Sequence, residues 1–143
     1  MDLSPGMLKR AVARARRLGR EVDFVLADAQ HLPFRDRAFT AVTATFVFCS
    51  VPDPVAGLRE ARRVVGEDGS LHFLEHVRAP NAVLGWIMDR LNPIGVRLTG
   101  ANINRDTVAN VEKAAISLAT VESRALGILK LMLATPTSTR PTA

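Results

Sequence analysis

The sequence predicts an α/β protein with a mostly parallel sheet. Short apolar segments rich in β-branched residues alternate along the chain with segments of helical periodicity, an order typical of strands joined by crossover helices. One of these segments, 40–48, is apolar at consecutive positions, which is typical of a parallel strand buried on both faces. The last two predicted strands follow each other with no helix between them, so we expect them to form an antiparallel pair.

The first predicted helix begins at Ser4-Pro5 and ends near Gly19. Serine suits the N-cap, proline the first helical position and glycine the helix end. Most positions outside its apolar face are basic, so we expect the apolar face to cover the sheet and the basic side to lie in solvent. Alternatively, the basic side binds nucleic acid or anionic lipid. The apolar face consists of Leu8, Ala11, Val12, Ala15 and Leu18.

The remaining elements are predicted from periodicity and from turn residues. They are a strand at 23–27, a loop at 28–39, strands at 40–48 and 70–77, a helix from Asp53-Pro54 to about Val65, a turn at 67–70, a helix at 81–98 interrupted at Asn92-Pro93, a helix at 104–115, and strands at 117–123 and 127–134. A chain of 143 residues is long enough for one domain with its own core. We place that domain at 1–134 and expect a disordered tail at 135–143, which is rich in Thr and Pro.

Composition excludes several classes of protein. With 48% hydrophobic and 23% charged residues, the chain is a globular protein and not a disordered one. The single cysteine, Cys49, excludes an internal disulfide and fits a reducing compartment. Neither a secretory signal nor an apolar run of 18 residues is present, so we expect a cytoplasmic protein.

Several polar residues follow directly on predicted strands. Asp28 ends the strand at 23–27, Thr45 lies near the end of the next strand, and Glu75 and His76 end the strand at 70–77. In open α/β sheets, ligands bind outside the carboxyl ends of the strands. The sequence therefore predicts a ligand site at this edge of the sheet.

Three stretches carry a resemblance to a known family. They are "DLSPGML", "ADAQHLPFRDRAF" and "VFCSVPDPVAGLREARRVVGEDGSLHFLEH". In order and spacing they resemble the class I S-adenosylmethionine-dependent methyltransferases of the ubiquinone/menaquinone-methyltransferase-like group, methyltransferase type 11. The later stretch "EHVRAP…W…LNP…TGANINRDT" is similar to the thiol and lipid methyltransferase branch. The resemblance implies a Rossmann-like methyltransferase sheet.

The resemblance also implies S-adenosylmethionine as the cofactor, no metal, and roles for five cofactor-binding residues. Asp2 would accept hydrogen bonds from the ribose hydroxyls, and Asp28 from the adenine amino group, with the backbone N–H of Ala29 facing the ring. Thr45 and Phe46 would border the methionine portion and the transferred methyl group. Local alternatives stay open, because Asp2 also suits a position ahead of a helix cap, and Asp28 suits a turn after a strand.

His76 is the candidate catalytic residue. It lies at the end of a strand, and a histidine side chain can take up a proton near neutral pH when the nucleophile must lose one. A hydrogen-bonded structural histidine is the alternative interpretation.

The family's first strand and glycine-rich loop have no counterpart in this sequence, whose glycines stand isolated. The resemblance therefore implies a chain truncated at its N-terminus that begins at the end of the family's second strand. Loss of a central strand would expose unpaired sheet edges, and a partner chain or a dimer could cover them. As written, the chain is expected to bind the cofactor poorly, and its activity stays open.

Residues 81–98 are too apolar for an ordinary exposed helix. In this family the corresponding segment often borders the methyl acceptor. The apolar composition therefore predicts a hydrophobic acceptor, such as a lipid, a quinone precursor or a thiol, and allows peripheral membrane contact. Packing of the segment against the sheet is the simpler interpretation.

Methyl transfer is the predicted function. The alternatives are a non-catalytic basic binding module and a subunit that completes another chain's methyltransferase fold. Nucleic acid is not expected, because no aromatic residues accompany the basic helix.

Overall fold

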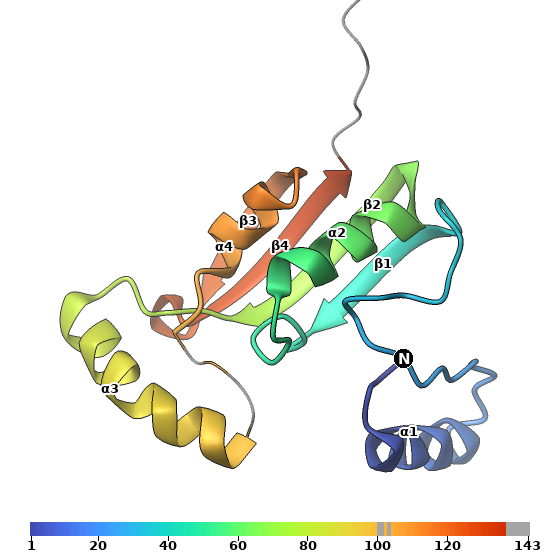
Figure 1. Ribbon diagram of the computed structural model, residues 1–143, viewed down its shortest axis with the longest axis horizontal. Helices are drawn as coiled ribbons and strands as arrows, with labels where there is room; N and C mark the ends of the chain where they lie inside the picture. Colours follow the sequence, from blue (N-terminus) through green and yellow to red (C-terminus); the bar gives the residue numbers. More distant parts are fainter. Residues whose placement is uncertain (100–101, 103, 137–143) are drawn as a thin grey trace, which may run out of the picture.

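The computed structural model describes residues 1–99, 102 and 104–136. Figure 1 shows the elements in chain order. They are α1 (Pro5–Arg17), β1 (Phe39–Thr45), α2 (Pro54–Val64), β2 (Val65–His76), α3 (Ala82–Thr99), α4 (Thr107–Lys113), β3 (Ile116–Arg124), the 3-10 helix η1 (Ala125–Gly127) and β4 (Leu129–Pro136).

The four strands form one sheet in the order β1-β2-β4-β3. β1 and β2 are parallel and joined by α2, as a strand–helix–strand crossover requires. β4 lies antiparallel to both β2 and β3. The predicted α/β class and the antiparallel C-terminal pair are therefore both present, and β1 forms an edge of the described sheet.

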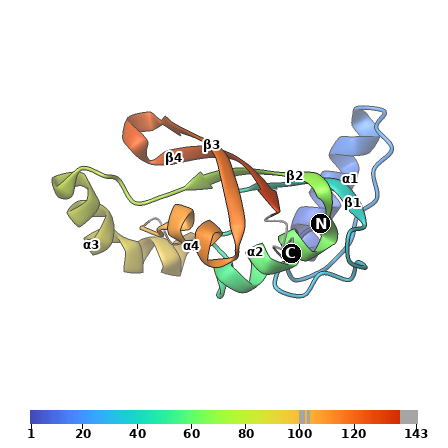
Figure 2. The same cartoon turned by 90° about the horizontal axis from the view of Figure 1, so that it is seen from above.

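One face of the sheet carries the core. α2 and α4 lie on the same side of the strands, as the two views in Figures 1 and 2 show. Phe73 of β2 is fully buried there and meets Phe48 edge to face, with 5.4 Å between the ring centroids. Further fully buried side chains of this layer are Leu58, Leu71, Val111 and Met132.

The opposite face of the sheet is more open. Along β2 the residues alternate between the two faces, so His72 is exposed while Leu71 and Phe73 are buried. The partner strand repeats this pattern, with Leu131 exposed and Met132 buried. Within the described part of the chain, the sheet is thus covered mainly on one side.

The N-terminal region differs from the prediction. α1 has the predicted start and end, and Gly19 adopts the left-handed conformation (φ +59°) that suits a helix terminus. However, none of its residues is buried, and it lies beside the sheet, beyond β1, and does not cover it (Figure 1). Its apolar side faces an open hollow shared with Leu26.

The predicted strand at 23–27 is reduced to a single parallel bridge between Asp2 and Leu26. A strand persists only where a neighbour takes up its backbone hydrogen bonds. The only such neighbour among the described residues is the short segment around Asp2, so the prediction of a full strand was wrong.

Other boundaries also differ from the predicted ones. β1 ends at Thr45, three residues before the predicted end, because Phe46 turns out of the strand with φ 55°. The predicted turn at 67–70 lies inside β2, where the pairing register shifts opposite Thr40. Pro93 does not interrupt α3, which continues through it. β4 continues to Pro136, and the rest of the predicted tail, 137–143, lies outside the described residues.

Candidate functional site

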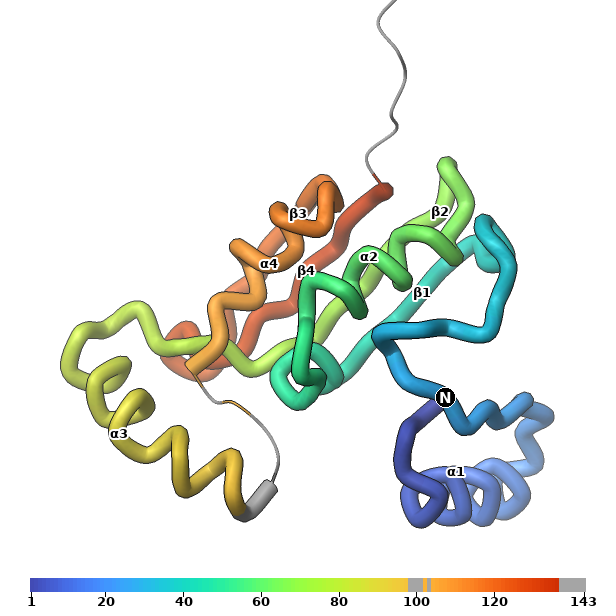
Figure 3. The backbone as a smooth tube through the Cα atoms, viewed as in Figure 1, coloured from blue at the N-terminus to red at the C-terminus, as the bar shows by residue number. Residues whose placement is uncertain are grey.

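Asp2 and Asp28, predicted to bind the two ends of one nucleoside, are brought together by backbone pairing. The N–H of Asp2 donates to the carbonyl of Val25 (3.2 Å), and the N–H of Ala27 donates to the carbonyl of Asp2 (3.2 Å). Asp2 is thereby held opposite Leu26, two residues before Asp28. Figure 3 shows the N-terminus beside the segment that leads into the following loop.

The Asp28 carboxylate is oriented by Gln30. It accepts hydrogen bonds from the Gln30 backbone N–H (2.9 Å) and from the side-chain amide of the same residue (3.0 and 3.1 Å). These donors, the backbone N–H first, hold the pKa of Asp28 below its ordinary value. Gln30 in turn accepts from the N–H of Asp53, the N-cap of α2 (2.9 Å). Asp28 is therefore an ionised acceptor tied to the start of α2.

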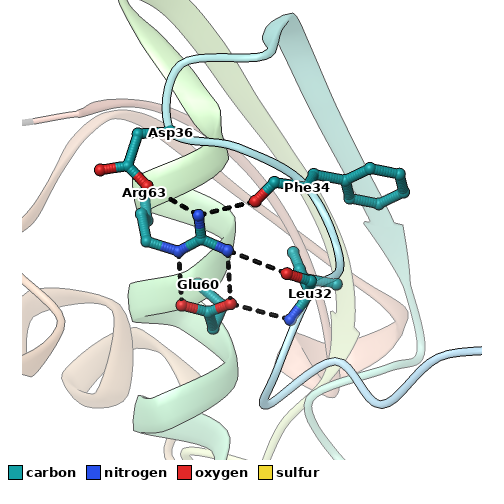
Figure 4. A network of polar contacts seen from close by, with 5 residues as sticks. All are labelled: Leu32, Phe34, Asp36, Glu60 and Arg63. Atoms are coloured by element: carbon teal, nitrogen blue, oxygen red, sulfur yellow. Dashed lines mark hydrogen bonds and ion pairs between the residues drawn. The ribbon is translucent and has the colours of Figure 1, made fainter.

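A clamp centred on Arg63 holds the loop that follows Asp28 against α2 (Figure 4). The guanidinium group forms a two-point ion pair with Glu60 (2.7 and 2.8 Å) and donates to the carbonyls of Leu32 (3.0 Å) and Phe34 (2.8 Å). It also pairs with Asp36 (2.7 Å). Glu60 completes the clamp by accepting from the N–H of Leu32 (2.8 Å), so one helix fixes both ends of this segment.

Gly57 joins the Asp28 loop to the end of β1. A Cβ atom at this position would lie 3.5 Å from the Ala29 carbonyl oxygen and 3.2 Å from the ring of Phe48. Both groups therefore pack on the same turn of α2, and glycine allows that close approach. The loop that carries Asp28 and Ala29 and the loop after β1 are neighbours in the structure.

Thr45 and Phe46 lie at the carboxyl end of β1, as the sequence predicts. Thr45 is exposed, and the Phe46 ring is 46% exposed. The N–H of Phe46 donates to the carbonyl of Leu74 (2.9 Å), which keeps the turn attached to β2. A positive φ at a non-glycine residue is uncommon and needs such support from its surroundings.

Glu75 supplies that support from inside the protein. Its fully buried carboxylate accepts three consecutive backbone N–H groups, those of Val47 (2.9 Å), Phe48 (3.1 Å) and Cys49 (3.2 Å). Burial raises the pKa of Glu75, while the three donors act in the opposite direction. Burial also raises the pKa of the Cys49 thiol, which disfavours a reactive thiolate.

His76 lies on the other face of β2 from Glu75, because side chains alternate along a strand. Its Nδ1 atom is buried, and no hydrogen-bond partner for it is found among the described residues. A buried ring nitrogen without a partner is uncommon in native proteins. The structure thus places His76 near the carboxyl edge of the sheet but not beside the Glu75 carboxylate.

The hydrogen-bond acceptors at this edge of the sheet fit the nucleoside half of S-adenosylmethionine. Carboxylates such as Asp2 and Asp28 can accept from ribose hydroxyls and from an adenine amino group. The backbone around Ala29 and the exposed Phe46 ring add a donor and an apolar surface. No cluster of His, Cys, Asp or Glu suited to a metal ion is found in the described part of the chain.

A family model described as "Methyltransferase domain" matches residues 1–73, just over half of the chain. The chain belongs to the methyltransferase domain family. S-adenosylmethionine is the methyl donor of this family, and the predicted family is thereby confirmed. The family model covers the five residues predicted to bind the cofactor, and the match ends before Glu75 and His76.

One relative is the demethylmenaquinone methyltransferase of Lactobacillus johnsonii. It is 36% identical over 109 residues, which are 73% of this chain and 45% of the relative. The methyltransferase-domain chain thus spans less than half the length of this curated relative.

Solved structures share the fold. A Bacillus halodurans protein assigned as a methyltransferase superposes with a TM-score of 0.72 at 25% identity, covering 85% of this chain and 53% of that chain. The [4+2]-cyclase SpnF superposes with a TM-score of 0.76 at 19% identity, covering 93% of this chain and 63% of that chain. These likenesses confirm the Rossmann-like methyltransferase fold. Because a cyclase shares it, the fold alone does not decide the reaction.

The sequence did not predict the roles of three residues at the site, of which only Glu75 had been noted, as a polar residue at the end of a strand. Gln30 orients Asp28, Arg63 clamps the loop, and Glu75 organises the turn at Phe46. A carboxylate inside an otherwise apolar strand was the available signal for Glu75. Gln30 and Arg63 each have one partner nearby in sequence, Asp28 and Glu60. Their other contacts, with the Asp53 N–H, with the Leu32 and Phe34 carbonyls and with Asp36, join segments that only the fold brings together.

Proposed function

We propose that this chain carries the nucleoside side of an S-adenosylmethionine site and serves methyl transfer to a small, hydrophobic acceptor. The observation that carries the proposal is the convergence of Asp2, the Asp28 loop and the Phe46 turn at the carboxyl edge of the sheet. The confirmed family gives the reaction class, and the residues present supply acceptors where the cofactor has donors.

The chain's own residues have three tasks in this scheme. Asp2 and Asp28 bind and orient the nucleoside, and the ordered turn at Phe46 sets the boundary of the reacting region. The partly exposed Phe46 ring would cover the reacting region and exclude water from it when the cofactor is bound. The bound cofactor supplies an already activated methyl group, so alignment is the main requirement.

His76 is proposed as the base for acceptors that must lose a proton. Its buried Nδ1 atom without a partner is consistent with a nitrogen that meets a ligand. A His76→Ala variant should lose methyl transfer to a protonated acceptor while cofactor affinity stays unchanged. Full retention of turnover in this variant would exclude the role.

A quinone precursor is the acceptor that we favour. The relative from Lactobacillus johnsonii is named for methylation of demethylmenaquinone. The exposed apolar residues of α3, among them Trp86 and Ile87, give an apolar surface on the segment that follows β2. Transfer of a labelled methyl group into an organic-soluble quinol, in the presence of this chain, would test the assignment directly.

Cofactor binding is tested with Asp28→Asn. The amide substitution keeps the shape but replaces one acceptor oxygen with a donor, so affinity for S-adenosylmethionine should fall about tenfold or more. Asp23→Asn is the matched control, because Asp23 is exposed and lies in the same segment. Equal affinity of the two variants by calorimetry would contradict the assignment of Asp28.

A second candidate role is that of a subunit completing another methyltransferase sheet. β1 forms a sheet edge among the described residues, and its sequence FTAVTAT contains no charge or proline to discourage pairing. α1, which lines an open hollow together with Leu26, lies beyond β1 in Figure 1. Co-purification with a strand-bearing partner that protects the β1 amides from exchange would support this role.

A further inference from the structure

The outer side of α3 combines apolar and basic side chains. Positions 83, 87, 90, 94 and 97 recur at spacings of three and four residues, so they share one helix face. Trp86 borders that face, is 60% exposed, and lies with its ring 5.7 Å from the guanidinium carbon of Arg90. The exposed apolar members of this surface, which we name the α3 outer face, are Val83, Trp86, Ile87, Leu91 and Ile94.

The inner side of α3 attaches the helix to the rest of the protein. Met88 is buried and its sulfur accepts from the N–H of Ala79 (3.4 Å). Asp89 pairs with Arg78 (2.9 Å) and accepts from the side chain of Asn104 (3.0 Å). The exposed apolar residues are therefore not needed to hold the helix in place.

A second link ties α3 to the candidate site. The Asn92 side chain donates to the side-chain oxygen of Asn102 (3.3 Å). The Asn102 N–H donates to the carbonyl of Cys49 (2.8 Å), in the loop that Glu75 organises. α3 and the carboxyl edge of the sheet are thus connected through two hydrogen bonds, made from the side of the helix opposite the α3 outer face.

The charge of the α3 outer face is positive. Arg90 and Arg97 are exposed and share this face, while the acidic residue of the helix, Asp89, is engaged on the inner side. Within the described residues, no helix is long and apolar enough to cross a membrane. A basic helix with exposed apolar residues and a tryptophan is instead typical of a helix that lies in the membrane interface.

We propose that the α3 outer face docks on an anionic lipid bilayer. The apolar side chains would enter the headgroup region, and Arg90 and Arg97 would contact lipid phosphates. Charge favours this occupant over a second copy of the chain, because a symmetric contact would bring the arginines of both copies to one interface. Docking through α3 places the loop around Cys49 near the lipid surface, and it does not depend on methyl transfer.

Trp86 is the only tryptophan of the sequence and therefore reports on this surface directly. The complete chain is titrated with vesicles of phosphatidylcholine containing phosphatidylglycerol, and with vesicles of phosphatidylcholine alone. We expect a blue shift of the tryptophan emission, quenching by brominated acyl chains and co-sedimentation with the anionic vesicles. An unchanged emission spectrum at saturating anionic lipid would overturn the proposal.

Two pairs of variants separate α3 from the basic helix α1. Arg90→Glu combined with Arg97→Glu should weaken vesicle binding about 25-fold or more, since each basic residue near an anionic surface contributes about fivefold. Arg10→Glu combined with Arg14→Glu on α1 is the matched control and should change binding much less. Loss of binding in the α1 pair, with binding retained in the α3 pair, would overturn the proposal.

A third comparison tests the apolar contribution. Val83→Ser combined with Ile87→Ser should weaken vesicle binding about tenfold, whereas Val121→Ser combined with Leu126→Ser, at exposed positions outside α3, should leave it unchanged. Circular dichroism verifies that every variant is folded. A blue-shifted Trp86 emission without lipid, growing with protein concentration together with a dimer, would assign the face to a second copy and overturn the proposal.

Discussion

Replacing Glu75 tests how the turn at the end of β1 is held. Glu75→Ala removes the acceptor for three backbone N–H groups, those of Val47, Phe48 and Cys49. Glu75→Gln is milder, because its amide oxygen can keep the two bonds made by Oε1, while its NH2 group faces the N–H of Cys49 as a second donor. Glu75→Ala therefore removes three hydrogen bonds, and Glu75→Gln removes one.

The size of the effect follows from burial. Phe48 and Cys49 are buried, so each abandoned N–H costs about 1–3 kcal/mol, while the N–H of Val47 can reach water more easily. Removing the buried carboxylate also relieves its own desolvation, which offsets part of the loss. We expect Glu75→Ala to lower the free energy of unfolding by about 3 kcal/mol and Glu75→Gln by about 1–2 kcal/mol.

Urea unfolding followed by circular dichroism measures this difference, provided that the slope with denaturant stays constant. Glu67→Gln is the matched control, since Glu67 lies on the same strand but forms an exposed ion pair with Arg37, and it should cost less than about 0.5 kcal/mol. Amide exchange at residues 46–49 should accelerate in the Glu75 variants alone. A Glu75→Ala variant as stable as Glu67→Gln would show that the Glu75 carboxylate does not hold this turn.

Three further predictions concern the clamp and the core. Arg63→Met should release the carbonyls of Leu32 and Phe34 and lower the free energy of unfolding by about 1–2 kcal/mol. Amide exchange at Leu32 should become faster in this variant, and an unchanged exchange rate there would count against the clamp. Hydrogen bonds from Arg63 lower the pKa of Glu60, so the unfolded state binds more protons and stability is lost as pH falls below about 4.5. Wild type should therefore lose urea resistance more steeply than Glu60→Gln between pH 5 and about pH 3, and parallel curves would contradict this. Leu58→Ala, at a fully buried position of α2, should cost about 3 kcal/mol in the same unfolding assay, and a loss below about 1 kcal/mol would show that the site is not closely packed.

Helix starts were predictable because their chemistry is local. Ser4 accepts from the N–H of Met7 (3.3 Å), and Asp53 accepts from the N–H of Ala56 (3.0 Å). In each case the cap lies three residues before its donor, and proline follows it. Such signals can be read from a few consecutive residues, whatever the rest of the chain does.

Strand limits and site details were less predictable because they depend on distant partners. The segment at 23–27 has strand composition, but a strand also needs a neighbour. The end of β1 depends on Glu75, which lies more than 25 residues away in sequence from the amides that it binds. The candidate residues themselves were predicted from family resemblance, and their grouping at one edge follows from the parallel pairing of β1 with β2.

Mapping of ligand contacts by nuclear magnetic resonance tests the proposed nucleoside site most directly. The ¹⁵N-labelled chain is titrated with S-adenosylhomocysteine, the demethylated form of the cofactor, and the amide shifts are followed residue by residue. We expect the largest shifts to cluster at Asp2, at 28–30 and at 45–48, and Asp28→Asn to weaken them. Shifts confined to α4 and β3, or no shifts at millimolar ligand, would contradict this expectation.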